Sequence, residues 1–494
     1  METLAHALPL DAIRFNCRAI DVQISPNSFP IVHLDDGTTI YSKVVVGCDG
    51  VNSIVAESLG VRAPSFDSMG RIRVVTTYPG KGHDFGNKSS RVTSTQIVLG
   101  RIPINHNLVH WFITYSRHGV KSLVLERGEL LRSEGAALAM WTNGWRALDA
   151  LGVGETLRHK SIPIHTVTDV CFEEGRQRSI PIGRDEVRCL KRSDLMETLG
   201  ESLPPETIRF NCKVVGVTIS PFSHSAVHLE NGTTISAKVV LGCDGVNSAV
   251  AKSLGLRNPC FDSFAAIRGF TSYSGKGHCI GNQIIRLKND RMVVGRLPVN
   301  HNLVHWFISR AWVPQDCEIS KEPKLIKEAA LGAISKFPDE ITEMVKSCDQ
   351  SCLSLTQYRA RSPWELLVRT LHKHSVTLAG DAMHAMGPYT GQGCAVGLED
   401  SVVLGRCLGL AMRGCHEESE DQTRVRISMA LERYVKERKM RVIRMASQTY
   451  LVGLLVKPSF SPLKLIVLVV LLLFFGGLQG GTQYDCGTLL SPKS

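Results

Sequence analysis

The sequence predicts an α/β fold, and three stretches of the chain carry this prediction. An apolar strand at residues 376–379 ends in a glycine-rich loop, after which a helix begins near Gly391. A second apolar strand, at residues 122–125, precedes a helix at residues 143–151. A third apolar strand leads into Gly-Cys-Asp-Gly and another helix, and this pattern occurs twice. Strands followed by helices in this way are typical of a parallel sheet covered by helices.

The composition is that of a globular protein of 494 residues, a length that can hold two or three domains. Hydrophobic residues make up 43% of the chain and charged residues 21%. The net charge is +11, but Lys and Arg are scattered, so we expect no nucleic-acid partner. Eight basic residues at 424–444 are interleaved with apolar ones and predict an amphipathic helix. Its basic face could be solvated or lie on an anionic membrane surface.

The fifteen cysteines are dispersed, without a CxxC pair or a Cys/His cluster at metal-ligand spacing. We therefore expect no metal site, and free thiols in a reducing, intracellular compartment that is cytoplasmic by default. The N-terminal segment carries an acidic residue and has no long apolar core, so we do not expect it to be a secretory signal.

A long internal repeat organises the first two thirds of the chain. Residues 1–113 match residues 196–308 without a gap, at a constant offset of 195 residues. Each copy contains an apolar strand, then Gly-Cys-Asp-Gly-x-Asn-Ser, then a helix whose N-terminus could face a phosphate or a sugar. One unit exceeds a hundred residues and occurs twice, so the pattern predicts a partial tandem duplication rather than a solenoid.

The run GDAMHAMGPYTGQG, at residues 380–393, has the features of a ligand site. Glycines allow close approach of the backbone, and the first-turn amides of the following helix point outward with the positive end of the helix dipole. Asp381, at the C-terminal end of a strand, is placed to accept hydrogen bonds from sugar-like hydroxyls. The glycine spacing by itself would equally suit a helix packed tightly on a sheet.

This full run resembles the second flavin-binding motif of the single-component FAD-dependent aromatic-hydroxylase family, in the branch with zeaxanthin epoxidase-like plant monooxygenases. The resemblance implies a FAD-binding, three-layer Rossmann-like domain with an inserted α+β substrate domain. It also implies that Asp381 binds a ribitol hydroxyl of FAD. The residues that would line the isoalloxazine ring are Pro388, Gly391, Gln392 and Gly393. His384 lies in the motif, with a structural or a catalytic role left open.

Three further stretches resemble cofactor-binding parts of the same family. The repeated GCDGVNS resembles its Asp-Gly motif, which implies that Asp244, Gly245 and Ser248 lie near FAD and the path of NAD(P)H. Asp49, Gly50 and Ser53 match equally in the first copy. Glu126 ends the strand at residues 122–125, where an acidic residue takes the adenosine ribose hydroxyls. The arginines that resemble family residues on the cofactor side are Arg132 and Arg192.

The pyrophosphate loop of such a fold is missing from the sequence. A GxGxxG loop is expected roughly 20 residues before Glu126. The three glycine positions fall near Pro103, Asn105 and Leu108, where the side chains would obstruct close approach of the backbone. The segment instead reads as the tail of the first repeat.

The resemblance implies a monooxygenase that uses FAD, NAD(P)H and O2 to hydroxylate or epoxidise a lipophilic or aromatic small molecule. In such chemistry the flavin reacts and no protein nucleophile is needed. No catalytic side chain is identified in the sequence. The missing loop keeps a second interpretation open, in which the chain is a non-catalytic flavoprotein remnant that has lost stable FAD binding. A partner chain that completes the missing unit, and hence the oligomeric state, is also left open.

The sequence predicts five segments, together with substrate-sheet strands at residues 163–186. An apolar run at 465–475 is too short to span a bilayer, so we expect either a core helix or an interfacial anchor with peripheral membrane contact. The predicted segments are the truncated duplicate at 1–115, the first part of the FAD-binding domain at 116–256, the substrate-domain sheet at 257–363, the second part of the FAD-binding domain at 364–445, and the apolar C-terminal segment at 446–494.

Overall fold

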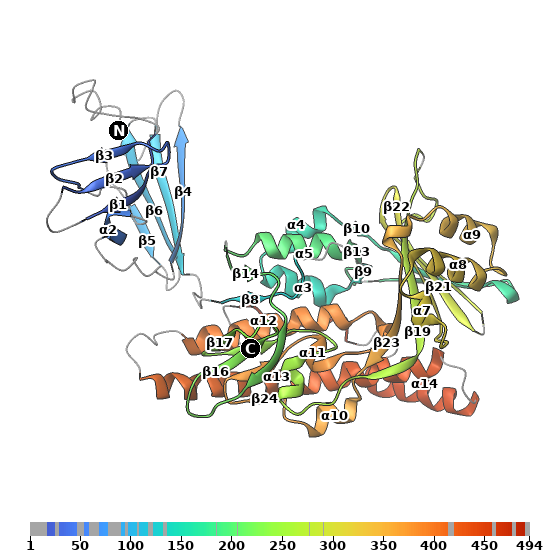
Figure 1. Cartoon of the computed structure of the whole chain (residues 1–494). Helices are drawn as coiled ribbons and strands as arrows, with labels where there is room; N and C mark the ends of the chain where they lie inside the picture. Colours follow the sequence, from blue (N-terminus) through green and yellow to red (C-terminus); the bar gives the residue numbers. More distant parts are fainter. Residues whose placement is uncertain are drawn as a thin grey trace. The chain divides into compact units, whose positions relative to one another are not determined.

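A computed structural model describes most of the chain from residue 122 to residue 489 and parts of the chain before it (Figure 1). The described N-terminal residues are 17–24, 29–46, 54–58, 69–77, 90–93, 97–105 and 108–116. Within 122–489, the residues outside the described part are 132–135, 184, 205, 276, 290, 413–418, 457–460 and 477–480. The chain divides into two compact units, Met1–Gly119 and Val120–Ser494.

The described residues of the first unit form two antiparallel sheets and a short helix. The three-stranded sheet has the order β1-β2-β3, and the four-stranded sheet has the order β4-β7-β6-β5. The elements are β1 (Ala19–Gln23), β2 (Ile31–Leu34), β3 (Thr39–Tyr41), α2 (Ile54–Ser58), β4 (Met69–Thr77), β5 (Ser90–Thr93), β6 (Ile97–Asn105) and β7 (Leu108–Ser116).

Elements of the first unit recur in the second at the spacing of the sequence repeat. β6 corresponds to β21 (Met292–Asn300) and β7 to β22 (Leu303–Ala311), each 195 residues later. The pairing of β6 with β7 shifts register between Pro103 and Asn105, and the pairing of β21 with β22 shifts between Pro298 and Asn300. The two copies therefore share both their strand boundaries and this irregularity.

The segment that replaces the expected glycine loop forms an antiparallel hairpin. Pro103 pairs with Val109 and Asn105 pairs with Leu108, between β6 and β7. A pyrophosphate loop requires a strand, a tight turn and a helix N-terminus, because the phosphate lies on first-turn amides. The hairpin provides no helix, so the prediction that this segment is not a GxGxxG unit is confirmed.

A seven-stranded sheet forms one part of the second unit, with the order β12-β11-β20-β21-β22-β19-β23. β11 and β12 come from the stretch at 163–186, where alternation predicts substrate-sheet strands. Along β19, Ala265 and Ile267 belong to a core shared with the helices, whereas Phe264 and Ala266 belong to a core on the opposite face. The elements are β11 (Thr166–Cys171), η1 (Phe172–Glu174), β12 (Arg176–Pro181), β19 (Cys260–Ser272), β20 (Gln283–Lys288), α7 (Asp316–Ile319), α8 (Pro323–Ala333), α9 (Asp339–Lys346), η2 (Gln350–Cys352) and β23 (Ser354–Ala360).

The other part of the second unit is an α/β arrangement built from several small sheets. The sheets have the orders β14-β8, β18-β25-β24, β15-β16-β17 and β10-β13-β9. Their strands are β8 (Val124–Leu125), β9 (Ala137–Met140), β10 (Ile162–Pro163), β13 (Arg188–Lys191), β14 (Ile208–Arg209), β15 (Val214–Thr218), β16 (Ser225–Leu229), β17 (Thr234–Ala237), β18 (Val240–Gly242), β24 (His372–Lys373) and β25 (Val376–Leu378). One hydrophobic core joins these sheets to the helices around them.

The helices of this α/β part confirm the stretches predicted at 143–151 and after Gly391. The long α13 packs against α12, and α12 also packs against α3. The helices are α3 (Thr142–Ala150), α4 (Gly154–His159), α5 (Arg192–Glu201), α6 (Ala249–Ser253), α10 (Pro363–Val368), α11 (Asp381–His384), η3 (Pro388–Thr390), α12 (Gly393–Met412), α13 (Glu420–Val456) and α14 (Ser461–Phe475).

The parallel strands of this part belong to two separate sheets. β8 pairs in parallel with β14, and β18 pairs in parallel with β25. Among the described residues, β8 has no second strand partner and neither does β18. A dinucleotide-binding fold joins such strands into one continuous sheet through its first strand. The break in the sheet is the structural counterpart of the missing GxGxxG unit.

The basic stretch at 424–444 is helical as predicted, but its basic residues do not form one solvated face. Arg438 and Arg441 are buried. Both guanidinium groups bind Glu399, a buried residue of α12. The simple interpretation of a basic face exposed to solvent is therefore wrong for these two arginines, because buried carboxylates on the neighbouring helix attract them.

Candidate cofactor site

The turn after β25 presents Asp381 at an exposed position. Gly380 has φ of +60°, a left-handed conformation that favours glycine. Its amide nitrogen donates a hydrogen bond of 2.9 Å to Asp400 Oδ2, and Asp381 begins α11 directly afterwards. The Asp381 side chain is exposed, which is the arrangement that the sequence predicts for a carboxylate aimed at a ligand.

The loop from Pro388 to Gly393 ends at the N-terminus of α12. Gly391 has φ of +65°, and a Cβ atom placed there would meet no atom within 4 Å. Gln392 is 3% exposed, yet its Nε2 atom has no hydrogen-bond partner. Open space in front of Gly391 and a buried, unpaired amide group beside it suit the polar edge of a planar ring. The described residues of this half of the site therefore fit a flavin.

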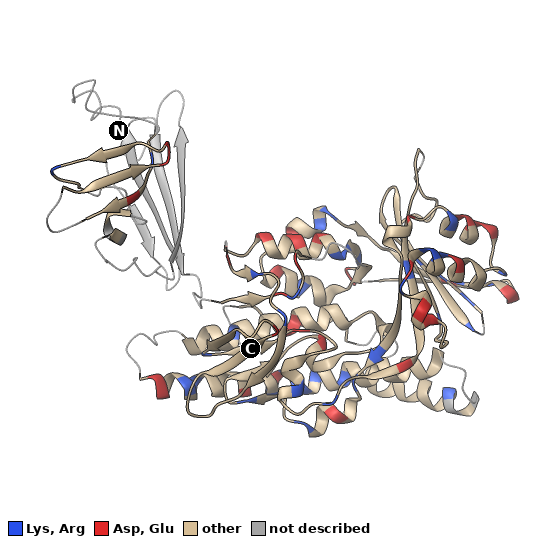
Figure 2. Ribbon diagram, in the orientation of Figure 1, with Lys and Arg blue, Asp and Glu red and all other residues tan. Residues whose placement is uncertain are grey.

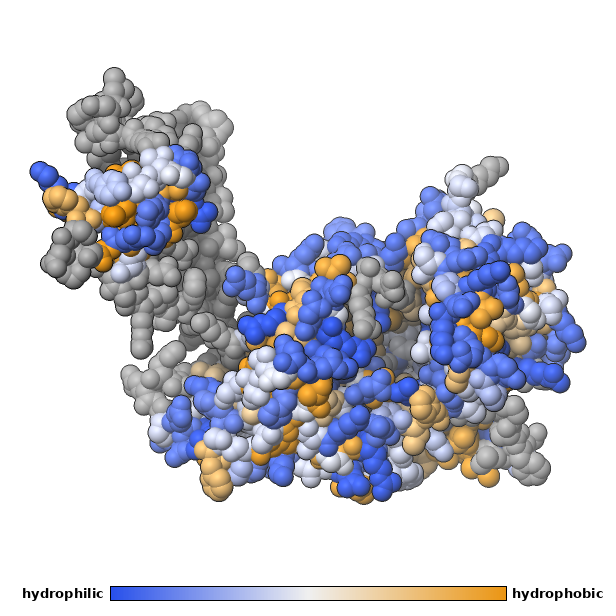
Figure 3. Space-filling model, in the orientation of Figure 1, coloured by the Kyte–Doolittle hydropathy of each residue, from blue (hydrophilic) through white to orange (hydrophobic). Residues whose placement is uncertain are grey.

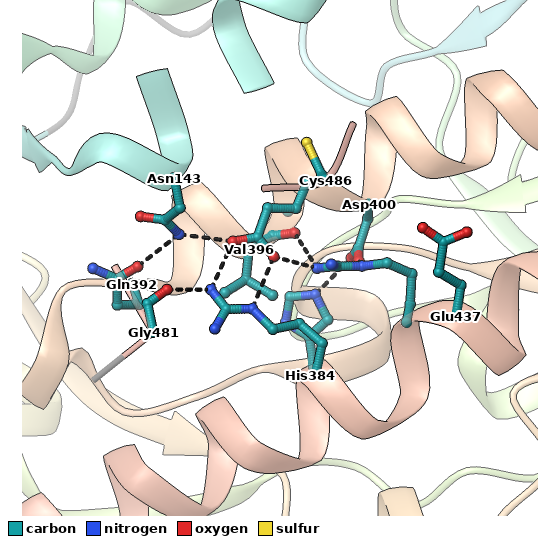
Figure 4. A network of polar contacts seen from close by, with 12 residues as sticks. Asn143, His384, Gln392, Val396, Asp400, Glu437, Gly481 and Cys486 are labelled. Carbon is teal, nitrogen blue, oxygen red and sulfur yellow. Dashed lines mark hydrogen bonds and ion pairs between the residues drawn. The ribbon is translucent and has the colours of Figure 1, made fainter. Parts of the chain in front are cut away.

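A buried polar network holds this loop and the turn at Gly380 that precedes it (Figure 4). Asn143 Nδ2, on α3, donates to Gln392 Oε1 at 3.0 Å and to Glu399 Oε1 at 2.7 Å. Glu399 also accepts hydrogen bonds from Arg438 at 2.7 Å and from Arg441 at 2.8 Å. Gln392 is thereby tied to α3 and α12 and, through Glu399, to α13.

The neighbouring carboxylate, Asp400, fixes the turn at Gly380 and the short helix α11. Its Oδ2 atom lies 2.6 Å from His384 Nε2 and accepts the Gly380 amide hydrogen, while its Oδ1 atom accepts from Arg438 Nε at 2.8 Å. His384 is fully buried, so the structure supports its structural role among the two alternatives. Asp400 therefore connects Gly380, α11 and α13 through one side chain.

Burial of this network is compatible with ionised carboxylates because cations surround them. Burial disfavours the charged form of Glu399, but its contacts with Arg441 and Arg438 bring the pKa of this carboxyl below its ordinary value. Burial likewise opposes ionisation of Asp400, and there His384 and Arg438 lower the pKa. Such groups are retained in a protein interior only when they are paired and hydrogen-bonded.

Cys394, in the first turn of α12, reports which charges lie near the loop. Burial raises the pKa of this thiol to about 11, the charge of Asp381 raises it further, and the charge of Arg192 lowers it. Both charges act on this thiol, so Asp381 and Arg192 each lie near Cys394. Arg192 is the exposed first residue of α5. The structure thus brings together Asp381 and Arg192, which are far apart in the sequence.

The predicted ribose-binding residue, Glu126, lies directly after β8. Its Oε1 atom accepts a hydrogen bond of 2.7 Å from the Gly128 amide, so the carboxylate stabilises its own turn and keeps one oxygen for another partner. Arg132 lies outside the described residues. The adenosine end of the site is therefore represented by one residue in the described part.

The Asp-Gly motif caps α6. Asp244 accepts hydrogen bonds from the amide of Ala249, at 2.7 Å, and from the Ser248 hydroxyl. Ser248 in turn accepts the Ala251 amide hydrogen at 2.8 Å, and Gly245 has φ of +76°. Such hydrogen bonds are the usual way in which the free amides of a first helical turn find partners. Most of the hydrogen-bonding capacity of the Asp244 carboxylate is therefore taken up within its own turn. The matching residues of the first copy, Asp49, Gly50 and Ser53, lie outside the described residues.

Sequence reasoning missed the link between the cofactor loop and the seven-stranded sheet. The Tyr389 hydroxyl donates to Asp262 Oδ2 on β19 at 2.9 Å. The Tyr389 ring meets Tyr358 of β23 edge-on, with centroids 5.9 Å apart, and the Tyr358 hydroxyl donates to Ser309 Oγ at 3.0 Å. The one feature of the sequence that could have indicated this link is the aromatic residue between Pro388 and Gly391. Its partners lie more than thirty residues away, so no local motif marks them.

The chain is similar in sequence to a described family and to several monooxygenases. A family model described as "FAD binding domain" matches residues 114–449. Monooxygenase 1 of Arabidopsis thaliana is 40% identical over 385 residues, which cover 76% of this chain and 95% of the relative. A 3-amino-4-hydroxybenzoate 2-monooxygenase of Streptomyces platensis is 26% identical over 316 residues, which cover 60% of this chain and 75% of that protein.

A solved structure also matches the chain in fold. HpxO of Klebsiella pneumoniae, complexed with FAD and uric acid, superimposes with a TM-score of 0.58 at 17% identity. The match covers 71% of this chain and 86% of the chain of HpxO. The fold prediction, an α/β FAD-binding domain with an inserted sheet domain, is therefore confirmed.

Proposed function

The chain belongs to the family of FAD-dependent monooxygenases that share this FAD binding domain, and we propose that its own reaction takes place between the loop at 388–393 and the sheet of β19 and β23. When bound, FAD would supply the redox chemistry of a monooxygenation, in which NAD(P)H is oxidised, one oxygen atom of O2 enters the substrate and the other leaves as water. The residues of this chain would bind and orient FAD and the substrate and exclude water from the site.

We assign the flavin-ring half of the site to the described loop. Asp381 would bind the ribitol chain, Pro388, Gly391 and Gly393 would line the ring, and the amide of Gln392 would bind the ring edge. The observation that carries this assignment is the unpaired Nε2 atom of buried Gln392, held beside open space at Gly391. Leaving a buried amide without a partner is costly unless a ligand satisfies it.

We assign the remaining cofactor contacts to three elements around this loop. Arg192, at the start of α5, would lie on the cofactor side near Asp381. Glu126 would take the adenosine ribose, as an acidic residue does at the end of a second strand. Asp244 and Gly245, at the start of α6, would line the approach of NAD(P)H. The α12 N-terminus would stabilise negative charge on the reduced ring.

We infer that the substrate is a small lipophilic or aromatic molecule. The side chains that join the loop to the sheet are mostly aromatic, and Phe264 and Tyr358 form the buried face of the sheet beside Tyr389. The Arg268 guanidinium lies over the Tyr358 ring, 5.9 Å from its centroid, and would orient a polar substituent. The named aromatic substrate of the Streptomyces relative is consistent with this substrate class.

A second candidate, a non-catalytic remnant without stable FAD binding, is favoured by the broken sheet. The pyrophosphate of FAD normally lies on the turn after the first strand. Among the described residues, no strand joins β8 to β18, and the expected loop positions form a hairpin in the first unit. The two candidates differ in one measurable property, the affinity of the chain for FAD.

The test is FAD titration of the full chain, followed by quenching of flavin fluorescence. Asp381→Ala removes the ribitol contact, and Asp421→Ala removes an exposed carboxylate at the start of α13 as a matched control. If the site assignment is correct, the natural chain binds FAD with micromolar or tighter affinity. Asp381→Ala then weakens binding at least tenfold, while Asp421→Ala does not.

A repaired variant separates the two candidates. It carries a strand-GxGxxG-helix segment inserted between residues 117 and 122, which leaves the strands of the first unit intact. If only the repaired variant binds FAD, the natural chain is a remnant that has lost its cofactor. The same result would show that the loop around Asp381 can still bind FAD. Equal binding by both chains, followed by NADH or NADPH oxidation with substrate, would support the enzyme.

A further inference from the structure

The C-terminal helix α14 exposes an apolar surface. Of its described residues only Val467 and Leu471 are buried. Seven other large apolar side chains are between 40% and 74% exposed, and part of this surface is visible at the lower right of Figure 3. They are Leu465, Ile466, Leu468, Val469, Leu472, Leu473 and Phe474. A contiguous apolar surface of this size on a folded protein usually marks a docking site.

The helix is held firmly against the body of the unit. It runs antiparallel to the end of α13, because the Phe474 carbonyl accepts a hydrogen bond of 3.4 Å from Arg444 on α13. Its buried side chains, Val467 and Leu471, form a cluster with Val452, and Tyr389 packs against this cluster. α14 therefore presents its exposed side from a fixed position.

The charge around α14 is of one sign. From residue 444 to residue 484 the sequence contains Arg444, Lys457 and Lys464 and no acidic residue. Figure 2 shows α14 almost entirely without charge, in contrast to the mixed charges of the other helices. An apolar helix flanked by cations is complementary to an anionic lipid surface, where the cations meet headgroups and the apolar side chains enter the acyl boundary.

We propose that α14 anchors this protein to the surface of an anionic membrane. No helix among the described residues is long and apolar enough to cross a bilayer. The fifteen residues of α14 are about 22 Å long, so the helix lies in the interface. Its exposed residues are aliphatic apart from Phe474, whereas protein interfaces are enriched in Tyr, Trp and Arg with a polar rim. This composition favours lipid over a protein partner.

Membrane contact would place the lipid close to the cofactor loop. Tyr389, which lies between Pro388 and Gly391, packs against the cluster that Val467 and Leu471 form with Val452. A consequence that rests on the proposed function is that a lipophilic substrate reaches the site from the bilayer. The anchoring itself requires no bound FAD, so it can be tested separately.

Vesicle flotation of the full chain tests the anchor. The vesicles contain phosphatidylcholine with or without phosphatidylserine, and no FAD is added. We expect the chain to float with the anionic vesicles, less with neutral ones, and less at high salt because the cations are then screened. The Leu465→Glu/Leu472→Glu variant places two anions in the exposed face and should reduce the bound fraction at least tenfold.

The control is Val425→Glu/Met429→Glu, two similarly exposed apolar side chains on α13, and it should float like the natural chain. Thermal unfolding checks that each variant is folded. If the α14 variant does not fold, Leu473→Ser/Phe474→Ser tests the same face without new charge. A natural chain that stays unbound with anionic vesicles at low salt overturns the proposal. So does a chain that forms an α14-dependent dimer without binding vesicles.

Discussion

The hydroxyl of Tyr389 donates a hydrogen bond of 2.9 Å to the carboxylate of Asp262. Tyr389 belongs to the loop assigned to the flavin ring, and Asp262 lies on β19 of the seven-stranded sheet. Burial, together with the charge of Asp262, raises the pKa of the Tyr389 hydroxyl, which keeps it protonated as a donor. One hydrogen bond thus joins the loop that we propose to bind the flavin ring to the sheet that we propose to contact the substrate.

Tyr389→Phe should lower the free energy of unfolding by about 1.5–3 kcal/mol, the usual value of a hydrogen bond to a charged group. Urea unfolding measures this loss. Asp262→Asn and the double variant complete a thermodynamic cycle, in which we expect the two effects to be strongly non-additive because the residues are in direct contact. Additive losses would contradict a direct energetic link between the loop and the sheet.

Gly453→Ala should displace the Tyr389 ring. A Cβ atom at this position of α13 would lie 2.7 Å from Tyr389 Cε2. Replacing a helical glycine by alanine normally stabilises by about 0.5–1 kcal/mol. We expect a net loss of thermal stability here, since the ring is held by its hydroxyl. Gly332→Ala in α8 is the control, because its Cβ would meet no atom within 4 Å and the ordinary gain should appear. Equal gains for both variants would show that the ring moves freely.

Asp400→Ala should be among the most damaging single changes in the second unit. The substitution leaves Arg438 and His384 buried beside one missing partner. Breaking a buried ion pair by removing one side typically costs about 3–5 kcal/mol. Urea unfolding should show this loss, whereas Asp421→Ala, which breaks an exposed pair with Arg424, should change stability by less than about 1 kcal/mol. Similar small effects in both variants would mean that the network is not a source of rigidity.

The stability of the second unit should decrease as the pH falls below about 6.5. Burial lowers the pKa of His305 from its ordinary value of 6.5 to about 3, and its Nδ1 lies 3.0 Å from the Gly269 carbonyl. The folded pKa is the lower one, so between these values the unfolded chain binds a proton that the folded chain excludes. Stability is complete above pH 6.5 and is lost progressively toward pH 3.

His305→Gln should therefore reduce the difference in unfolding midpoint between pH 7 and pH 5, whatever it does to stability at pH 7. His301→Gln changes an exposed histidine of the same hairpin and serves as the control. Urea unfolding at the two pH values measures the difference for each chain. An unchanged pH dependence in His305→Gln would show that other groups dominate acid destabilisation.

Much of the cofactor loop could be predicted from the sequence because its determinants are local. The apolar run before Gly380, the glycine at 391 and the helix after it specify a strand, a turn and a helix within about thirty residues. The missing pyrophosphate loop was equally visible, since it depends on glycine at three positions. The exposure of the Asp381 side chain could be predicted from the same residues, because Asp381 directly follows the strand and Gly380.

The tertiary structure decided what depends on distant partners. In the predicted basic helix, Arg438 and Arg441 are buried in the core instead of exposed to solvent. They bind Glu399 and Asp400, which lie buried on α12, more than thirty residues earlier. Asn143 reaches Gln392 across 249 residues of sequence. Side-chain pairs of this kind depend on how helices pack, and helix periodicity alone does not determine it.

The sequence by itself determined the family, the internal repeat at an offset of 195 residues and the absence of the GxGxxG unit, because each depends on a motif of contiguous residues. It left α14 either as a core helix or as a surface anchor, since an all-apolar helix satisfies both patterns. The packing on α13 buries Val467 and Leu471 and leaves seven other large apolar side chains exposed, which argues against a core helix and is the basis of the proposed anchor. Burial is a property of the assembled fold, so it could be read only from the tertiary structure.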